Sequence, residues 1–271
     1  MLDYKAKIFI SDLHLGDGSR ADDFHRKDEL LKLLEIAAKE NFLLIVVGDL
    51  FELWQSDLKN IILEHREIID KLLYLRRNGK LLHLIGNHDH IPFVKYIGTG
   101  LGVELEYNDA GIWAEHGNQY DIFNRYQDPR LEKRNKWGRA CAFVVGWMER
   151  LLHPDIDEWV LDSLIREEGV FTKHVGKLKK MITPSSSEYI KKGGDLSEYE
   201  EAAKKRIETG EKIVVFGHTH RPKLKKITGG IYANCGCWCG KEQIPTYIKV
   251  DSGKVTLVNG IDHTTINSLE L

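Results

Sequence analysis

The sequence predicts an α/β fold of layered strands and helices, and two observations lead to that prediction. About the first 120 residues alternate short apolar runs of strand type with amphipathic stretches of helical spacing. Each apolar run ends in a short polar motif. A chain of 271 residues, 42% of them hydrophobic, is also long enough to bury a sizeable core.

Three strands are expected first, at residues 8–10, 42–47 and 81–85, because each run is short and apolar. Residues 28–39 lie between the first two runs and place their leucines at helical spacing. Residues 61–75 repeat this helical pattern before the third run. We expect both helices to cover the core.

Further strands are expected around a helical insertion. Residues 122–211 are rich in helix formers and charges and contain few chain-breaking residues, which predicts a helical insertion or lid. The core would then comprise residues 1–121 and 212–271. Strand-like runs that would complete a second sheet lie at 111–114, 212–216, 230–233, 246–250 and 254–258.

Composition limits the partners and the compartment. The chain has 39 Lys and Arg against 41 Asp and Glu, a formal net charge of -2, so dedicated nucleic-acid binding is not expected. No charged-then-apolar leader precedes the first strand-like run, and no stretch approaches the ~18 apolar residues of a membrane span. These features favour a cytoplasmic protein.

Three of the four cysteines lie close together in the sequence. Cys235, Cys237 and Cys239 alternate with Gly and Trp, whereas Cys141 stands apart. The cluster could bind a soft metal, but alternate residues of a strand also present small apolar side chains on one face. The Cys-x-x-Cys pairs of ordinary zinc sites are missing. Packing is therefore the favoured interpretation, with metal binding as the alternative.

Polar motifs follow five of the expected strands. In open α/β sheets ligands bind at the carboxyl ends of the strands, where the loops converge on a crevice. The alternating pattern Asp-x-His and His-x-His would also project both side chains of each pair to one side of an extended segment. The motifs are Asp12-Leu13-His14, Gly48-Asp49, Gly86-Asn87-His88-Asp89, His116-Gly117-Asn118 and Gly217-His218-Thr219-His220.

The side chains in these motifs predict a centre for two divalent metal ions. Carboxylate oxygens, an amide oxygen and imidazole nitrogens together suit Mn, with Fe, Zn and Co as alternatives. Two such ions about 3.5 to 4 Å apart can clamp a phosphate and supply hydroxide at neutral pH. The candidate ligands are Asp12, His14, Asp49, Asn87, His116, His218 and His220.

The ordered motifs resemble the signature of the calcineurin-like metallophosphoesterase superfamily, and the resemblance runs from Ile8 to about Tyr247 without the insertion. It implies a two-sheet αββα sandwich, with the metals at one sheet edge. It also implies that His88 stabilises or protonates the leaving oxygen, oriented by Asp89, although Asp89 could instead cap a helix. The implied ligands are Asp12, His14 and His220 for one metal, Asn87, His116 and His218 for the other, and Asp49 as the bridge.

Two segments are similar to one branch of that superfamily, which contains UDP-2,3-diacylglucosamine diphosphatase. These are Ser-Asp-Leu-His-Leu-Gly and Gly-Asp-Leu-Phe-Glu-Leu-Trp, the second carrying Phe51, Glu52 and Trp54. Members of the branch usually have Arg at the position of His88. The resemblance implies hydrolysis of a phosphate ester or pyrophosphate on a small phosphorylated molecule, with a lipid-linked nucleotide sugar as the specific candidate.

The insertion offers candidate substrate contacts. Between residues 125 and 139 it carries six basic residues against two acidic ones, and arginine forks match phosphate oxygens bidentately. A solvated helix face is the alternative for each residue singly. An apolar stripe at residues 137–152 would pack internally, accept acyl chains or give peripheral membrane contact. The candidate substrate-binding residues are Arg125, Arg134, Arg139 and, after the fourth motif, Asn118.

Two other functions remain open at this point. The same metal core would serve a nuclease or a cyclic-nucleotide phosphodiesterase, although the neutral charge argues against a nuclease. A non-catalytic scaffold is a further alternative, but a scaffold has no physical need for buried carboxylates and imidazoles that a metal must balance.

Overall fold

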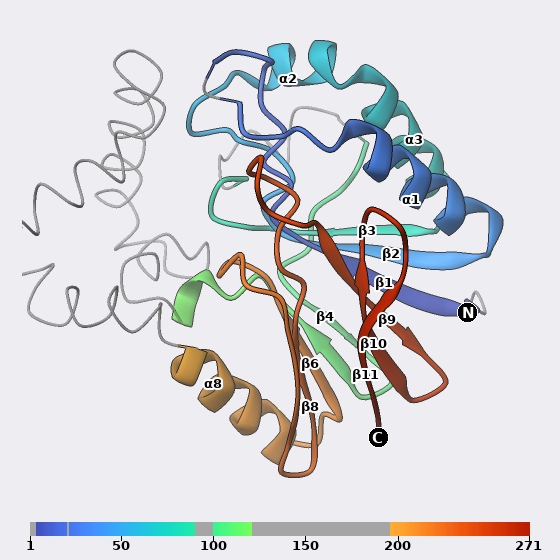
Figure 1. Cartoon of the computed structure of the whole chain (residues 1–271), viewed down its shortest axis with the longest axis vertical. Helices are drawn as coiled ribbons and strands as arrows, with labels where there is room; N and C mark the ends of the chain where they lie inside the picture. Colours follow the sequence, from blue (N-terminus) through green and yellow to red (C-terminus); the bar gives the residue numbers. More distant parts are fainter. Residues whose placement is uncertain (1–3, 21, 90–99, 121–195) are drawn as a thin grey trace, which may run out of the picture.

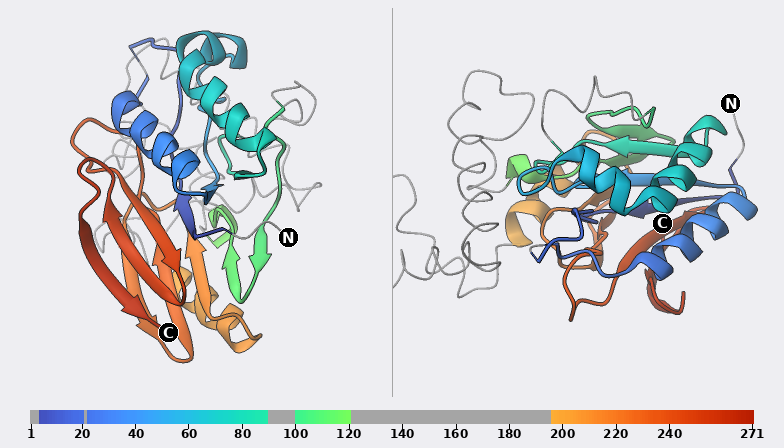
Figure 2. Two further views of the ribbon diagram at one scale, coloured as in Figure 1. Left: turned by 90° about the vertical axis from the view of Figure 1, so that its right-hand side faces the viewer. Right: turned by 90° about the horizontal axis from the view of Figure 1, so that it is seen from above.

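The computed structural model describes residues 4–20, 22–89, 100–120 and 196–271. Within these residues two β-sheets face each other, and helices cover the outer side of each sheet (Figures 1 and 2). The expected two-sheet αββα sandwich is therefore confirmed. No helix in the described part of the chain is long and apolar enough to cross a membrane.

The first sheet has six strands in the order β11-β10-β9-β1-β2-β3. Strands β1, β2 and β3 are parallel, whereas β9 joins β1 antiparallel and leads into an antiparallel edge. The bounds are β1 Ala6–Ile10, β2 Phe42–Val47, β3 Leu81–Leu84, β9 Thr246–Asp251, β10 Lys254–Asn259 and β11 Thr265–Glu270.

The second sheet has five strands in the order β4-β5-β6-β8-β7. Its central strands β5, β6 and β8 are parallel, and β4 and β7 close the two edges antiparallel. The bounds are β4 Tyr107–Asp109, β5 Ile112–Ala114, β6 Ile213–Phe216, β7 Lys223–Ile227 and β8 Gly230–Asn234.

The alternation of side chains along the strands builds separate apolar layers. On β1, Ile8 and Ile10 face the helices while Phe9 faces the second sheet. On β6, Val214 and Phe216 face outward to α8 while the alternate residues face the first sheet. Because both faces of each central strand are buried, these strands read as continuous apolar runs.

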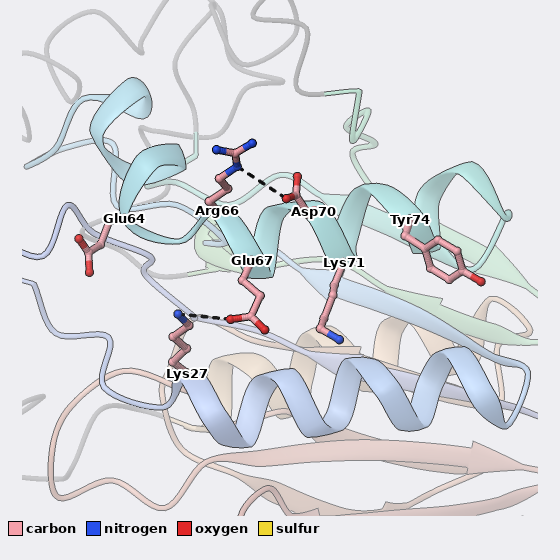
Figure 3. Close-up of a pocket in the computed structure, with 7 residues that line it drawn as sticks. All are labelled: Lys27, Glu64, Arg66, Glu67, Asp70, Lys71 and Tyr74. Carbon is pink, nitrogen blue, oxygen red and sulfur yellow. Dashed lines mark ion pairs between the residues drawn. The ribbon is translucent and has the colours of Figure 1, made fainter.

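The outer helices use amphipathic faces. α1 (Lys27–Lys39), α2 (Leu58–Glu64) and α3 (Arg66–Arg77) pack on the first sheet, and α8 (Leu196–Glu208) packs on the second. Between α1 and α3 runs a charged surface groove in which Lys27 faces Glu67 at 3.5 Å (Figure 3). None of the predicted site residues lines this groove.

Several elements differ from those that the sequence predicts. Residues 61–75 form not one helix but parts of α2 and α3, which are separated at His65. The edge strands β7 and β11 were not expected, because most of their residues are not fully buried and they lack an apolar run. Helix α8 lies within the segment assigned to the insertion but is a layer of the sandwich. The division of the chain at residues 122 and 211 stays a prediction.

The topology explains why distant motifs meet. β1, β2 and β3 run parallel in one sheet, and β5, β6 and β8 run parallel in the other. The loops that follow these strands gather at one edge of the sandwich and carry all of the predicted metal ligands.

Candidate metal centre

The first half of the centre is formed by the loops after β1 and β6. Oδ1 of Asp12 lies 3.9 Å from Nε2 of His14 and 3.3 Å from Nε2 of His220. Asp12 Oδ1 and His14 Nε2 are buried and have no hydrogen-bond partner among the described residues. Two buried polar atoms left unpaired would be costly, so their arrangement fits a cation between them.

The second half lies between the loops after β3, β5 and β6. Nε2 of His116 lies 3.1 Å from Oδ1 of Asn87 and 3.3 Å from Nδ1 of His218. Asn87 and His116 are both buried. This set of an amide oxygen and two imidazole nitrogens matches the ligands expected for the second ion.

Asp49 joins the two halves. Its Oδ2 lies 3.0 Å from Nε2 of His116 and 3.8 Å from Nε2 of His14. Its Oδ1 accepts a hydrogen bond from the backbone N–H of His88 at 2.8 Å, which fixes the carboxylate. One carboxylate oxygen thus faces imidazoles of both halves, as a bridging ligand would.

Two of the imidazoles are oriented by the ring nitrogen that faces away from the centre. Nδ1 of His14 lies 2.7 Å from Oε2 of Glu52, and Nδ1 of His116 lies 2.8 Å from the carbonyl oxygen of Val47. If Nδ1 carries the hydrogen in both rings, Nε2 presents its lone pair to the centre. Partners of this kind commonly set the tautomer of metal-binding histidines.

The charges of the centre are strongly coupled. Burial by itself would raise the pKa of Asp49, but the neighbouring imidazoles of His116 and His88 hold it well below its ordinary value. Burial would lower the pKa of His116, yet the carboxylate of Asp49 raises it to about 9. Burial likewise opposes ionisation of Glu52, but His88 and His14 lower its pKa to about 2. In the metal-free protein, protonated histidines therefore balance the carboxylates that metal ions would balance.

The backbone at the predicted ligands has an uncommon conformation. φ is 53° at Asp12, 48° at His14, 51° at Asp49, 66° at His218 and 55° at His220. The expectation of an extended Asp-x-His or His-x-His segment is therefore wrong: these side chains converge from left-handed loop residues. Such residues cost of order 1–3 kcal/mol each and cluster at functional sites.

Glycines next to the ligands allow the loops to approach closely. A Cβ at Gly86 would collide with the carboxylate of Asp49, and a Cβ at Gly48 would collide with the ring of His116. The glycines of the Gly-Asp and Gly-Asn motifs are therefore part of the geometry of the centre.

His88 lies at the rim of this centre. Its Nδ1 is 2.7 Å from Oε2 of Glu52, and its ring stacks on Trp54 with centroids 3.7 Å apart. The ring of His14 packs against it in a T-shaped arrangement, with ring centroids 4.5 Å apart. Glu52 therefore contacts both a predicted ligand and the predicted catalytic histidine.

Asp89 does not contact His88 in the way that the resemblance implied. The buried carboxylate accepts hydrogen bonds from the backbone N–H groups of Leu50, Phe51 and Gly86, at 3.2, 2.8 and 3.2 Å. It also lies 3.2 Å from Nε2 of the buried His83. Asp89 thus ties the loop after β2 to β3, and Glu52 takes the place beside His88. The helix-cap alternative stays a prediction, because residues 90–99, where such a helix would begin, lie outside the described residues.

The predicted substrate contacts are placed only in part. Asn118 opens a short 3-10 helix, η1 (Asn118–Tyr120), two residues after His116. Its side-chain nitrogen is buried without a hydrogen-bond partner among the described residues. Arg125, Arg134 and Arg139 lie outside the described residues, as does the apolar stripe of the insertion.

Sequence reasoning missed three contributors to the centre. Glu52 was noted only as part of a family motif, although a carboxylate three residues after Asp49 could have been considered as a partner for a histidine. Tyr199 of α8 stacks on His218, with centroids 6.5 Å apart. Sγ of Cys239 lies 3.8 Å from Nδ1 of His220. No local sequence signal links these last two residues to the motifs.

Comparisons with known proteins relate this chain to a family of phosphoesterases. Residues 8–222 match the calcineurin-like phosphoesterase family. The chain is similar to UDP-2,3-diacylglucosamine hydrolase of Ralstonia nicotianae (26% identity over 82% of this chain and 80% of the relative). It is also similar to the protein of that name from Pseudomonas fluorescens (28% identity over 82% of both chains).

A solved phosphoesterase from E. coli covers 98% of both chains at 12% identity, with a TM-score of 0.47, which is too distant to bear on function. The family match spans all five polar motifs, and the hydrolase relatives speak against the scaffold alternative. The chain belongs to the calcineurin-like phosphoesterase family, whose members bind divalent metals, and is a hydrolase.

Proposed function

We propose that this protein is a dinuclear metal-dependent phosphoesterase that hydrolyses the pyrophosphate of a lipid-linked nucleotide sugar similar to UDP-2,3-diacylglucosamine. The position of Asp49 supports a centre of two metal ions, because one of its carboxylate oxygens faces imidazoles of both halves. The names of the relatives from Ralstonia and Pseudomonas, which match about four fifths of the chain, support the substrate.

Seven residues would hold the metal ions. Asp12, His14 and His220 would bind one ion and Asn87, His116 and His218 the other, with Asp49 shared. The mixed nitrogen and oxygen donors favour Mn, and Fe, Zn or Co would also fit. Two divalent ions in this position neutralise charge on a phosphate and supply hydroxide near neutral pH.

The protein itself would handle the proton of the leaving group. Nδ1 of His88 faces Glu52, so Nε2 remains available to a substrate. The stacking of His88 on Trp54 restricts rotation of the imidazole ring. A protonated His88 held in this way would donate its Nε2 proton to the departing phosphate oxygen.

The test is a comparison of substrates with the full-length protein after metal removal and addition of Mn. The acylated UDP-sugar, the same UDP-sugar without acyl chains, bis-p-nitrophenyl phosphate and short single-stranded DNA are compared at equal concentration. We expect preferred cleavage of the acylated compound between its two phosphorus atoms, which yields UMP and an acylated sugar phosphate. The Asp49→Ala protein is the control for contaminating activity.

Other outcomes would revise the proposal in defined ways. Cleavage of the generic diester alone would keep the metal chemistry and reject the substrate. Faster cleavage of the DNA would favour the nuclease alternative. Equal rates with the acylated and non-acylated sugars would reject a role for the lipid.

A further inference from the structure

The cysteine cluster lies at the same edge of the sandwich as the metal ligands. Cys235 directly follows β8, which runs parallel to β6, and its backbone N–H donates to the carbonyl oxygen of Phe216. Because both strands end at this edge, the loop that carries Cys237 and Cys239 lies beside the loop that carries His220. The sequence favours packing for these thiols, with binding of a soft metal as the alternative.

The sulfur of Cys239 completes a pattern shared by three of the predicted ligands. Nδ1 of His14 faces Glu52 at 2.7 Å, and Nδ1 of His116 faces a carbonyl oxygen at 2.8 Å. Nδ1 of His220 faces Sγ of Cys239 at 3.8 Å, while its Nε2 lies 3.3 Å from Asp12. The three rings therefore have the same orientation: Nε2 toward a carboxylate of the centre, and Nδ1 toward an acceptor outside it.

We propose that Cys239 is a positioning residue for His220. Its sulfur accepts the Nδ1–H of the imidazole, which selects the tautomer that presents the Nε2 lone pair to the metal. This inference rests on the proposed function, because it takes His220 as a ligand. It assigns the sulfur the function that Glu52 has for His14.

The loop around Cys239 is held firmly enough for this function. The backbone N–H of Trp238 donates to the carbonyl oxygen of Asp12 at 2.9 Å, so the cysteine loop is tied to the ligand loop itself. The indole N–H of Trp238 donates to Thr246 at 2.9 Å, and the backbone N–H of Gly240 donates to Asp23 at 2.9 Å. Cys239 is only 8% exposed, so water does not readily replace its sulfur.

The partner of His220 matters because this ring is the least enclosed of the three. Its side chain is 39% exposed, compared with 7% for His14 and 1% for His116. An exposed imidazole can turn or change tautomer at little cost unless a neighbour holds it. We therefore expect the first ion, and not the second, to depend on Cys239.

The experiment compares Cys239→Ala and Cys239→Ser with wild type and with Cys237→Ala. Cys237 is a control in the same loop because it is also buried and its thiol contacts the backbone carbonyl oxygen of Cys239, whereas the sulfur that faces Nδ1 of His220 is that of Cys239. Each metal-free protein is titrated with Mn, and the affinities of the two ions are measured separately. Binding of Co is followed by its absorption spectrum.

We expect Cys239→Ala to lower the affinity for one of the two ions by at least about tenfold, the range seen when such hydrogen-bond partners of a ligand are removed. Cys239→Ser should recover part of the loss, because its hydroxyl can accept the same hydrogen. Cys237→Ala should bind both ions as wild type does. A general loss of structure would lower the affinity for both ions alike, and it would be detected in melting curves of the metal-free proteins.

Two results would overturn the inference. One is unchanged binding of both ions by Cys239→Ala and Cys239→Ser. The other is a sulfur-to-cobalt charge-transfer band that is present in wild type and absent from Cys239→Ala, because such a band would make the sulfur a direct ligand. If wild type itself failed to bind two ions, the proposed function would fail instead.

Discussion

At the scale of single residues, Asp49 lies in a position that requires compensating charge. It is 1% exposed, has a left-handed backbone and faces histidines from two different sheets. A buried carboxylate of this kind needs opposite charge close by. Protons on the histidines supply that charge in the metal-free protein, and metal ions would supply it in the active one.

We predict that Asp49→Ala abolishes activity and lowers the content of both metals, because one carboxylate serves both halves of the centre. Metal analysis after dialysis should give less than one ion per chain, and phosphate release should fall to background. A variant that retained two ions and normal turnover would disprove the bridging role. Asp70→Ala is a suitable control, because that side chain is 68% exposed on α3.

His88 should behave differently from the ligands. Because it contacts Glu52 and Trp54 at the rim, His88→Ala should leave the metal content unchanged and lower kcat by about 10²- to 10⁴-fold, the range of a lost proton donor. The measurement is kcat with substrates of different leaving groups. The loss should be smaller for p-nitrophenolate, which departs without a proton. An equal loss with every leaving group would contradict proton donation.

At the scale of elements, the loops after the strands are linked to one another by hydrogen bonds. Asp89, after β3, accepts hydrogen bonds from the loop after β2 and pairs with His83 on β3. Trp238, after β8, donates to the loop after β1. These hydrogen bonds connect the loops that carry the predicted ligands to their neighbours.

Asp89→Ala should accordingly lower the free energy of unfolding more than it lowers kcat. It leaves three backbone N–H groups and His83 without their acceptor, and we expect a loss of about 3 kcal/mol in the free energy of unfolding. Urea unfolding of the metal-loaded protein measures it. If stability were unchanged while kcat collapsed, Asp89 would have the orienting role that the resemblance implied.

At the scale of the whole molecule, metal binding and protonation compete for the same atoms. The pKa of His116 is raised from 6.5 to about 9 in the metal-free protein. This protonated form stabilises the metal-free fold fully below about pH 6.5, and that contribution is lost as pH rises through about 9. A metal ion must displace the same proton.

The affinity for Mn should therefore increase as pH rises to about 9, by up to about tenfold per pH unit for each proton displaced, and level off above that value. Calorimetric titrations in buffers of different ionisation enthalpy would count the released protons. An affinity independent of pH across this range would show that His116 is already neutral without metal.

The sequence by itself was enough to predict the family of this protein and the residues that gather at its candidate metal centre. Asp12, Asp49, Asn87 and the histidines stand at the ends of strands, and carboxyl ends of parallel strands share one edge of a sheet. That rule needs only the order of apolar runs and polar motifs. The buried central strands were equally predictable because both of their faces are apolar, as β2 shows.

Only the tertiary structure decided how the side chains are paired. Glu52 rather than Asp89 faces His88, and Cys239 faces His220, because loops from different strands bring these atoms together. Edge strands such as β7 could not be predicted from the sequence, because a strand that is half exposed needs no apolar run. Local sequence patterns indicate which side chains of a segment are buried, whereas contacts between loops depend on how the two sheets pack.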